Sequence, residues 1–378
     1  MAIGLYIHVP FCLRKCLYCD FVSYPLNREQ ADTYLDSLIK EINFYSETLC
    51  PENKKIATIF VGGGTPTCLM PGYLERILEQ IHRAFDIVSQ AEISIEANPG
   101  TVDFEKLKGL KEAGYNRLSL GVQSTHQDLL RSIGRIHSFR EAEQAVEFAR
   151  RAGFNNLNLD LIFGLPGQTL EQWRRTLEVV AAWRPEHLSC YGLQLEEGTP
   201  LADAVDAGKT KVCPEELELE MYLLGIKTLS TLGYGQYEIS NFARPNFLCQ
   251  HNLIYWHNNN YLGLGPAAHS FMDGTRFSNV SSLEEYTRLL FSGRRPIEES
   301  RTLGREEQMG DTIFLGLRLT EGLELNAFKT RFGVCVSEVF GKQIKKLQQE
   351  GLVELHKGIL KLTDKGVPVA NRVFCEFV

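Results

Sequence analysis

The sequence predicts an α/β protein with a parallel sheet in its first half and a smaller α+β domain towards its C-terminal end. Over the first 200 residues, six apolar runs of strand length alternate with amphipathic segments of helical period, and six β–α units in a row are typical of a parallel sheet. After residue 300 the order changes to three helices and then two short strands. Open sheets and barrels both contain such units, so this pattern alone leaves the two arrangements open.

Composition narrows the class of protein. The 378 residues allow about two or three domains, and an apolar content of 44% supplies a sizeable core. A net charge of −7 argues against binding to nucleic acid or to anionic lipid. No apolar run is long enough to span a membrane, and no signal or transit peptide fits ahead of Cys12. Ten cysteines, most of them scattered singly, fit a reducing compartment, so we expect a cytoplasmic protein.

The elements of the first half follow from periodicity and from end signals. Val, Ile and Leu dominate several of the apolar runs, as in buried parallel strands, and Gly114 and Gly153 stand where two helices would end. The predicted strands are Leu5–Pro10, Ile56–Gly62, Glu92–Asn98, Arg117–Gln123, Leu157–Gly164 and His187–Leu195. The predicted helices are Arg28–Thr48, Pro71–Phe85, Phe104–Ala113, Phe139–Ala152 and Leu170–Ala182.

The pattern changes after Gly198-Thr199-Pro200. A helix is predicted at Glu215–Leu232 and a strand at Tyr234–Ser240, followed by an irregular, aromatic-rich stretch to about Phe277. The final segment is winged-helix-like in order, although that likeness says little about function. Its predicted elements are helices Arg305–Leu317, Leu325–Phe332 and Val336–Glu350 and strands Val353–Leu355 and Leu360–Leu362.

The first predicted strand runs into a loop with three cysteines, Cys12, Cys16 and Cys19. Three thiolates at this spacing can hold three irons of a [4Fe–4S] cube, which leaves the fourth iron open to a small molecule. A structural zinc ion is the alternative, but it needs four ligands. Cys68 is the available fourth thiol, and the chain has no second Cys-x-x-Cys motif.

Polar or glycine residues follow the other strands, at the edge where parallel sheets place their functional groups. Gly62-Gly63-Gly64-Thr65 would let backbone approach a ligand, although a tight turn explains such a loop equally well. Glu96 is placed either to bind a ribose or to cap a helix. Gln123 and Arg135 follow the fourth strand. Asp160 lies inside an apolar strand, where it needs a ligand or a structural partner such as Arg117.

The three-cysteine spacing resembles the signature of the radical S-adenosylmethionine (radical SAM) family. That resemblance implies that the amino and carboxylate groups of S-adenosylmethionine chelate the free iron, and that an electron from the cluster generates a 5′-deoxyadenosyl radical. It also implies a partial (β/α)6 TIM-like barrel. We therefore expect a radical SAM barrel at residues 1–200, a central region at 201–300 and a C-terminal winged-helix-like α+β domain at 301–378.

Taken in order, the motifs resemble the branch of oxygen-independent coproporphyrinogen III oxidase (HemN) and its relatives, over nearly the whole chain. The resemblance implies that Cys12, Cys16 and Cys19 hold the cluster. It further implies that S-adenosylmethionine binds among Tyr6, Tyr18, Gly63, Gly64, Thr65, Glu96, Gln123, Arg135 and Asp160. No residue receives a catalytic role.

Two departures point away from the oxidases. Phe21 stands where they have a fourth cysteine, and only eleven residues precede Cys12. The hexad His251-Asn252-Leu253-Ile254-Tyr255-Trp256 is similar to one in the haem chaperones of the HemW branch. His251 is therefore the candidate haem ligand, with Cys249, His257 and His269 as alternatives. A histidine satisfied by a hydrogen bond beside packing aromatics is the plain structural reading.

The resemblance implies a haem chaperone that delivers haem to haem-requiring proteins such as respiratory enzymes. A coproporphyrinogen III oxidase, which converts its substrate by oxidative decarboxylation, is the alternative, and Phe21 and the short N-terminus speak against that activity. An electron donor such as flavodoxin or ferredoxin is implied, and nucleic acid is not. Whether the chain dimerises or touches a membrane transiently is left open.

Overall fold

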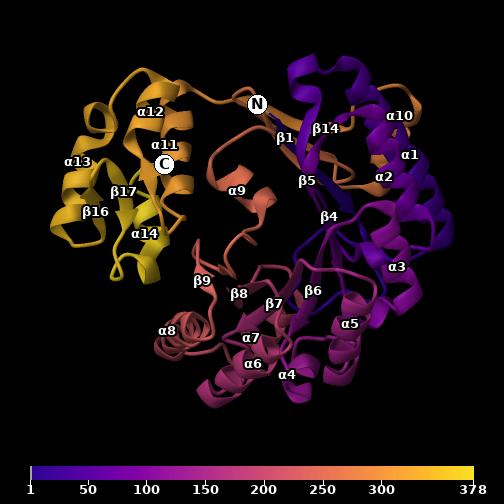
Figure 1. Cartoon of the computed structure of the whole chain (residues 1–378), viewed down its shortest axis with the longest axis horizontal. Coiled ribbons are helices and arrows are strands. Elements are labelled where there is room, and N and C mark those ends of the chain that lie inside the picture. Colours follow the sequence, from indigo (N-terminus) through magenta and orange to yellow (C-terminus); the bar gives the residue numbers. More distant parts are fainter. Residues whose placement is uncertain (1) are drawn as a thin grey trace.

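A twelve-stranded sheet forms the centre of the computed structural model, which describes residues 2–378 (Figure 1). Its order is β14-β13-β12-β11-β1-β4-β5-β6-β7-β8-β10-β9, with one edge at β14 and the other at β9. The seven strands from β11 to β8 are parallel, which confirms the α/β class and the six predicted strands. They are β1 (Ile3–Val9), β4 (Lys55–Gly63), β5 (Asp86–Ala97), β6 (Arg117–Gln123), β7 (Leu157–Phe163), β8 (His187–Gly192) and β11 (Tyr261–Leu264).

Helices cover the outer face of the parallel strands (Figure 1). Local signals set their ends: α5 begins at a capping box between Ser138 and Glu141, and α3 ends at Gly114, whose φ is +118°. The helices of this part are α1 (Arg28–Thr48), α2 (Tyr73–Ala84), α3 (Phe104–Ala113), α4 (Gln127–Ser132), α5 (Phe139–Arg151), α6 (Leu170–Ala182), α7 (Pro200–Asp206), α8 (Glu215–Thr231) and α10 (Leu283–Phe291). Shorter elements are β2 (Phe11–Cys12), β3 (Tyr24–Pro25), η1 (Pro51–Lys54), η2 (Pro66–Cys68) and η3 (Pro99–Thr101).

The two faces of the sheet differ in chemistry because successive strand side chains point in opposite directions. On β1, Leu5, Ile7 and Val9 belong to the main hydrophobic core beneath the helices. The alternate residues on the inner side are polar on several strands, as with Glu92 and Arg117, which form a buried ion pair. The inner face of the sheet therefore carries polar side chains, and ligand-binding groups on the strands can point towards the inside of the barrel.

The central region differs from the irregular stretch that we predicted, and the strand predicted at Tyr234–Ser240 is wrong. Two very short antiparallel strands, β9 (Gly235–Gln236) and β10 (Asn241–Ala243), replace it and extend the sheet beyond β8. Strands of two to five residues carry too few alternations for periodicity to detect them. The other elements are α9 (Gln250–Trp256), β12 (His269–Met272), β13 (Thr275–Asn279) and β14 (Ile297–Thr302).

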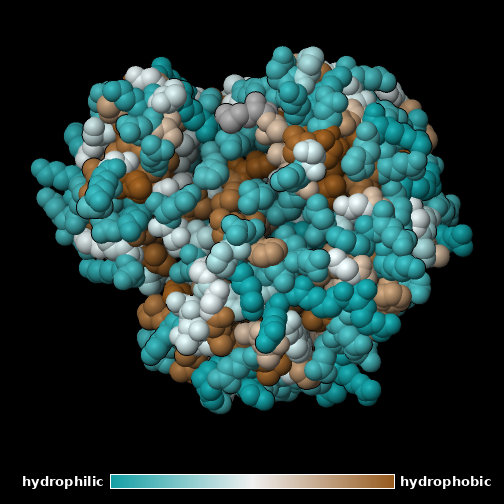
Figure 2. Space-filling view, in the orientation of Figure 1, coloured by the Kyte–Doolittle hydropathy of each residue, from teal (hydrophilic) through white to brown (hydrophobic). Residues whose placement is uncertain are grey.

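The C-terminal part has its own hydrophobic core and lies beside the barrel, with α9 drawn between the two (Figure 1). The three predicted helices and two strands are present, and β15, which pairs with β17, adds a third strand. Figure 2 shows hydrophilic side chains over most of one face and apolar ones in the recess between the two parts. The elements are α11 (Arg305–Gly316), β15 (Leu323–Glu324), α12 (Leu325–Phe332), α13 (Val336–Gln349), β16 (Val353–His356), β17 (Ile359–Leu362), η4 (Val367–Val369) and α14 (Ala370–Phe374). Among the described residues, none of the helices combines the length and apolar character of a membrane span.

Candidate functional site

A cavity of about 1160 Å³ opens at the carboxyl ends of the parallel strands. Parallel α/β proteins place their ligands at this edge. Most of the residues predicted for the cluster and for S-adenosylmethionine line it together, although they come from six separate segments of the chain. They are Cys12, Cys16, Tyr18, Cys19, Gly63, Gly64, Thr65, Glu96, Gln123, Arg135 and Asp160.

The loop with the three cysteines is held to the barrel by backbone hydrogen bonds. The Leu17 N–H donates to the Ile133 carbonyl at 3.0 Å, and the Tyr24 N–H donates to the Pro10 carbonyl at 2.8 Å. Cys12 is buried, whereas Cys16 and Cys19 are half-buried. Burial raises the pKa of the Cys19 thiol, and the neighbouring Cys16 and Cys12 thiols raise it further. The three sulfurs therefore share one electrostatic environment at the cavity wall.

The glycines at the end of β4 allow this strand end to lie against the cysteine loop. The Gly64 N–H donates to the Val9 carbonyl at 2.9 Å, and the Thr65 N–H donates to the Phe11 carbonyl at 2.7 Å. A Cβ on Gly64 would lie 2.5 Å from the Phe11 carbonyl oxygen. Thr65 then reaches Cys12, with 3.6 Å between its hydroxyl and the sulfur. Side-chain size at Gly64 thus sets the distance between the two loops.

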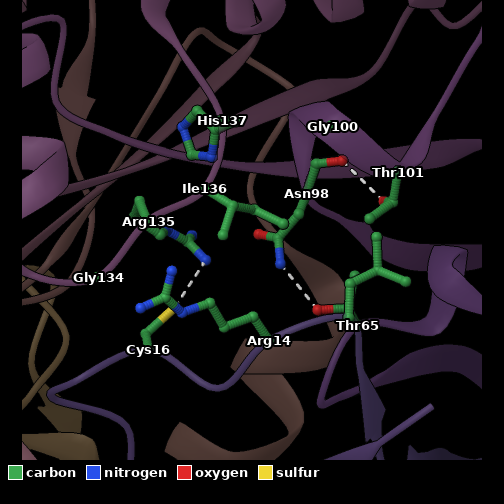
Figure 3. A pocket seen from close by; sticks show the side chains of 11 residues that line it. Arg14, Cys16, Thr65, Asn98, Gly100, Thr101, Gly134, Arg135, Ile136 and His137 are labelled. Carbon is green, nitrogen blue, oxygen red and sulfur yellow. Dashed lines mark hydrogen bonds between the residues drawn. The ribbon is translucent and has the colours of Figure 1, made fainter.

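Arg135 extends its guanidinium between Cys16 and the end of β6 (Figure 3). Its Nη1 lies 3.4 Å from the Cys16 sulfur, and its Nη2 donates to the Gly121 carbonyl at 3.0 Å. Its Nε is buried and has no hydrogen-bond partner among the residues that the structure describes. The guanidinium thus joins the cysteine loop to the sheet through two hydrogen bonds. The unsatisfied Nε indicates that this side chain is arranged for a further group.

Two carboxylates, Glu96 on β5 and Asp160 on β7, face the cavity from either side of β6. Glu96 accepts a hydrogen bond from the Gly63 N–H at 3.1 Å, and burial together with the charge of Asp160 raises its pKa to about 8. Asp160 accepts hydrogen bonds from Ser119 and Asn158, each at 2.8 Å. Arg117, the structural partner considered from the sequence, instead lies 4.0 Å from Glu92.

Gln123 and Tyr6 complete this part of the barrel in different ways. Gln123 lines the cavity with a φ of +64°, beside a register irregularity between β6 and β7. Such backbone strain is found mostly at functional sites. Tyr6 is not among the cavity-lining residues, and its hydroxyl lies 3.1 Å from His8 Nδ1 inside the barrel. Tyr6 is therefore placed to support the cavity floor rather than its wall.

The donor set fits a three-thiolate cluster better than a structural zinc ion. Within residues 2–378, no three or more His, Cys, Asp or Glu side chains converge as ligands of one ion. A cube does not need such convergence, because each thiolate binds a separate iron. Cys68, the fourth thiol considered for zinc, is buried in η2 and does not line the cavity. Burial and the Cys12 thiol raise the pKa of Cys68 to about 12, so it stays protonated.

His251 does not join this cavity but lies buried in α9, near the amino-terminal ends of the strands. Its Nδ1 is 2.7 Å from the Thr58 hydroxyl and its Nε2 is 2.8 Å from the Tyr255 hydroxyl. Burial, with the charge of Arg117, lowers its pKa to about 3. Both ring nitrogens are therefore occupied in this conformation. Of the alternative ligands, Cys249 is also buried, whereas His257 and His269 are exposed.

Sequence reasoning missed the far wall of the cavity, which the C-terminal domain supplies. This wall contains Arg318 and the segment Val367–Arg372. Apolar side chains also stand exposed around the cavity, among them Phe21, Leu219 and Val369. No motif marks Arg318 or Val367–Arg372, because they reach the cavity only when the C-terminal domain packs beside the barrel. Of the apolar residues, Phe21 alone had a signal in the sequence, as a large aromatic ring on a polar loop.

Comparison with known proteins agrees with this architecture. The Radical SAM superfamily model matches residues 6–180, and the HemN C-terminal domain model matches residues 303–369. A protein named heme chaperone HemW from Bacillus subtilis is 39% identical over 99% of this chain and 98% of its own length. The protein of the same name from Escherichia coli is 32% identical over 96% and 95%. The solved structure of coproporphyrinogen III oxidase (HemN) from Escherichia coli, a radical SAM enzyme, superposes with a TM-score of 0.86 at 25% identity, over 100% of this chain and 90% of that chain.

Proposed function

Because the chain belongs to the radical SAM superfamily, within its HemN/HemW branch, we propose that it is a haem chaperone. It would bind haem next to the cluster and S-adenosylmethionine that this superfamily uses, and release the haem to haem-requiring proteins such as respiratory enzymes. The names of its relatives support haem as the ligand. The single observation that supports a binding place for haem is the cavity between the barrel and the C-terminal domain.

Cys12, Cys16 and Cys19 would hold the [4Fe–4S] cluster. When bound, the cluster and S-adenosylmethionine supply one-electron chemistry to the cavity. Arg135 would hold the Cys16 sulfur in place, because its Nη1 donates to that sulfur at 3.4 Å. Glu96, with a pKa raised to about 8 by burial and by Asp160, can both donate and accept a hydrogen bond near neutral pH. Such a group suits the hydroxyls of a ribose.

Haem would lie on the outer side of this cavity. Pockets for one small ligand measure about 300–1,000 Å³, so about 1160 Å³ leaves room beyond a single ligand. Phe21 on the cysteine loop and Val369 on the C-terminal domain offer exposed apolar surface to a flat macrocycle. Arg14 and Arg372 line the same cavity and offer cations to the two propionates.

Haem titration of the anaerobically purified protein, followed by the Soret band, tests this placement. Burying a side chain such as Phe21 or Val369 contributes about 1.5–3 kcal/mol. The double variant Phe21→Ala, Val369→Ala should therefore bind haem at least about tenfold more weakly. Leu355→Ala is the matched control, because Leu355 is equally exposed on β16 and does not line the cavity. Equal haem affinity in the double variant and the parent protein would place haem elsewhere.

The axial-ligand prediction for His251 carries a structural condition. Its Nε2 would have to leave the Tyr255 hydroxyl, and α9 would have to move away from the strands that bury it. His251→Ala should then weaken haem binding and leave iron content intact, whereas Cys12→Ala, Cys16→Ala and Cys19→Ala should each abolish the cluster. Unchanged haem binding by His251→Ala would remove the assignment and leave Cys249, His257 and His269 as candidates.

An oxygen-independent coproporphyrinogen III oxidase is the second candidate, favoured by the likeness of this fold to that enzyme from Escherichia coli. Phe21, which stands at the position of a fourth cysteine in the oxidases, argues against it. An anaerobic assay with reductant, S-adenosylmethionine and coproporphyrinogen III decides between the two. We expect no vinyl-bearing product, and robust formation of protoporphyrinogen IX would overturn the chaperone proposal.

A further inference from the structure

We propose that His251 is a positioning residue for the S-adenosylmethionine site, acting through the ring of Phe60. This inference rests on the radical SAM assignment and not on haem binding. It gives the buried His251 a role in the conformation that the structure describes. To act as a haem ligand, in contrast, His251 would need α9 to move away from the strands.

A column of rings runs along the inside of the barrel from α9 towards the cavity. The His251 ring stacks on Phe60 with centroids 5.2 Å apart and an interplanar angle of 28°. Phe60 in turn stacks on Tyr6, at 6.3 Å and 30°. Tyr6 continues to His8 at 3.1 Å, and His8 Nε2 reaches the Val22 carbonyl on the cysteine loop at 2.8 Å. The column thus ends at the loop that carries the predicted cluster ligands.

The same column approaches Glu96 across Gly62. Gly62 separates the Phe60 ring from the Glu96 carboxylate, and a Cβ at this position would lie 2.9 Å from Phe60 Cε1 and 2.8 Å from Glu96 Oε2. The gap between the two side chains is therefore too narrow for one added methyl group. Glu96 also accepts from the Gly63 N–H at 3.1 Å. A shift of the Phe60 ring would move the cavity carboxylate and the glycine loop together.

His251 is itself held from three sides. Its Nδ1 bonds Thr58 on β4 at 2.7 Å, its Nε2 bonds Tyr255 at 2.8 Å, and its backbone N–H donates to Glu92 at 3.1 Å. Gly4 on β1 lies beside the ring, since a Cβ there would lie 3.4 Å from His251 Cε1, at ordinary contact distance. A side chain this fully fixed transmits its position to whatever packs on it.

The other end of α9 is fixed to the C-terminal domain. The Arg318 guanidinium lies 4.3 Å from the Trp256 ring centroid, and Arg318 lines the cavity. Arg331 donates to the Asn258 carbonyl at 2.7 Å, and Asn258 Nδ2 donates to Thr312 at 3.0 Å. The hexad 251–256 thus connects the ring column to the cavity wall. His251 stacks on Phe60, Tyr255 is hydrogen-bonded to His251, and Trp256 contacts Arg318, which lines the cavity.

The test measures S-adenosylmethionine binding to anaerobically reconstituted protein by equilibrium dialysis and by the change in the electron paramagnetic resonance spectrum of the reduced cluster. Loss of a supporting partner typically costs 10–100-fold in affinity at such sites. His251→Ala should therefore weaken binding on the order of tenfold at full iron content. Thr58→Val and Tyr255→Phe combined with His251→Phe restore a ring on Phe60 without leaving either hydroxyl that bonds the imidazole unpaired. This variant should bind within about threefold of the parent protein.

Two further variants keep the test decisive. Ile81→Ala removes an equally buried side chain from α2, in the outer core, and should not change binding. If His251→Ala fails to fold, Phe60→Leu breaks the same column and should show the same tenfold loss. Three results would each overturn the inference. One is parent-like S-adenosylmethionine affinity in His251→Ala, or in Phe60→Leu if His251→Ala does not fold. The others are weak binding by the Phe rescue variant and a tenfold loss in Ile81→Ala.

The design also separates this role from the haem proposal. Both His251→Ala and the Phe rescue variant lack the imidazole, so an axial-ligand role predicts weaker haem binding in both. The positioning role predicts weaker S-adenosylmethionine binding in the alanine variant alone. Absence of haem binding by the parent protein would defeat the proposed function and leave the positioning result standing.

Discussion

Replacing Gly64 by alanine tests whether the close approach of β4 to the cysteine loop builds the site. The new Cβ would lie 2.5 Å from the Phe11 carbonyl oxygen, where ordinary contact begins at 3.4 Å. The opposing atoms are backbone atoms of β2, so no side chain can rotate to relieve the overlap. The loop carrying Cys12 must therefore move by about 0.9 Å, and such overpacking costs about 1–3 kcal/mol of stability.

A displacement of that size matters more for the ligands than for the fold. Binding constellations need their groups within about 0.5 Å of the productive geometry, and a misplacement of about 1 Å can cost about a hundredfold. We expect Gly64→Ala protein to lose S-adenosylmethionine affinity by about ten- to a hundredfold and to retain less iron after anaerobic reconstitution. Equilibrium dialysis and iron and sulfide analysis measure the two effects.

Gly304 supplies the control for this experiment. A Cβ at Gly304 meets nothing within 4 Å, and its φ of −63° is open to any residue. Gly304→Ala should therefore behave as the parent protein in both measurements. If Gly64→Ala also takes up a full cluster and binds S-adenosylmethionine with the parent affinity, the close approach does not set the geometry of the site.

Two further predictions concern buried carboxylates outside the cavity. Burial raises the pKa of Glu41 to about 7 despite hydrogen bonds from Tyr286, Gly265 and Asn279. Between pH 4.5 and 7 the Glu41 carboxyl keeps its proton in the folded protein but loses it in the unfolded chain, whose pKa is 4.5. The free energy of unfolding should therefore fall by about 3 kcal/mol as the pH rises from 4.5 to 7. Anaerobic urea titrations of Glu41→Gln should lack this slope, and an unchanged slope would assign it to other groups. Glu92→Ala leaves the buried Arg117 guanidinium unpaired and should cost about 3–5 kcal/mol in the same titrations, so a loss below about 1 kcal/mol would contradict the ion pair.

Most of the barrel could be predicted because its signals are local. Each parallel strand is a long apolar run, and the glycine and cysteine motifs lie directly after strand ends. The β11–β14 strands were missed because they are short and because β11 pairs with β1 across the whole length of the barrel domain. The setting of His251 was also out of reach, since its partner Thr58 is 193 positions away in the sequence.

The same argument applies to the cavity. Eleven of its lining residues could be named from motifs, because parallel strands bring their carboxyl ends to one edge of the sheet. Its far wall depends on how the C-terminal domain packs, and Val369 and Arg372 carry no pattern that indicates it. Long-range packing, rather than local propensity, therefore decides which side chains form that wall.

The position of β1 has a consequence for how the protein is made. This strand, which leads into the cysteine loop, is paired on one side by β4 and on the other by β11, whose first residue is Tyr261. At about 5–20 residues per second, β11 leaves the ribosome roughly 10–50 seconds after β1. During that interval β1 is an open sheet edge, which is prone to pair with other chains. Iron that arrived during this interval would meet a cysteine loop whose supporting strand β1 is still unpaired on one side. Cluster assembly is therefore expected to follow completion of the chain.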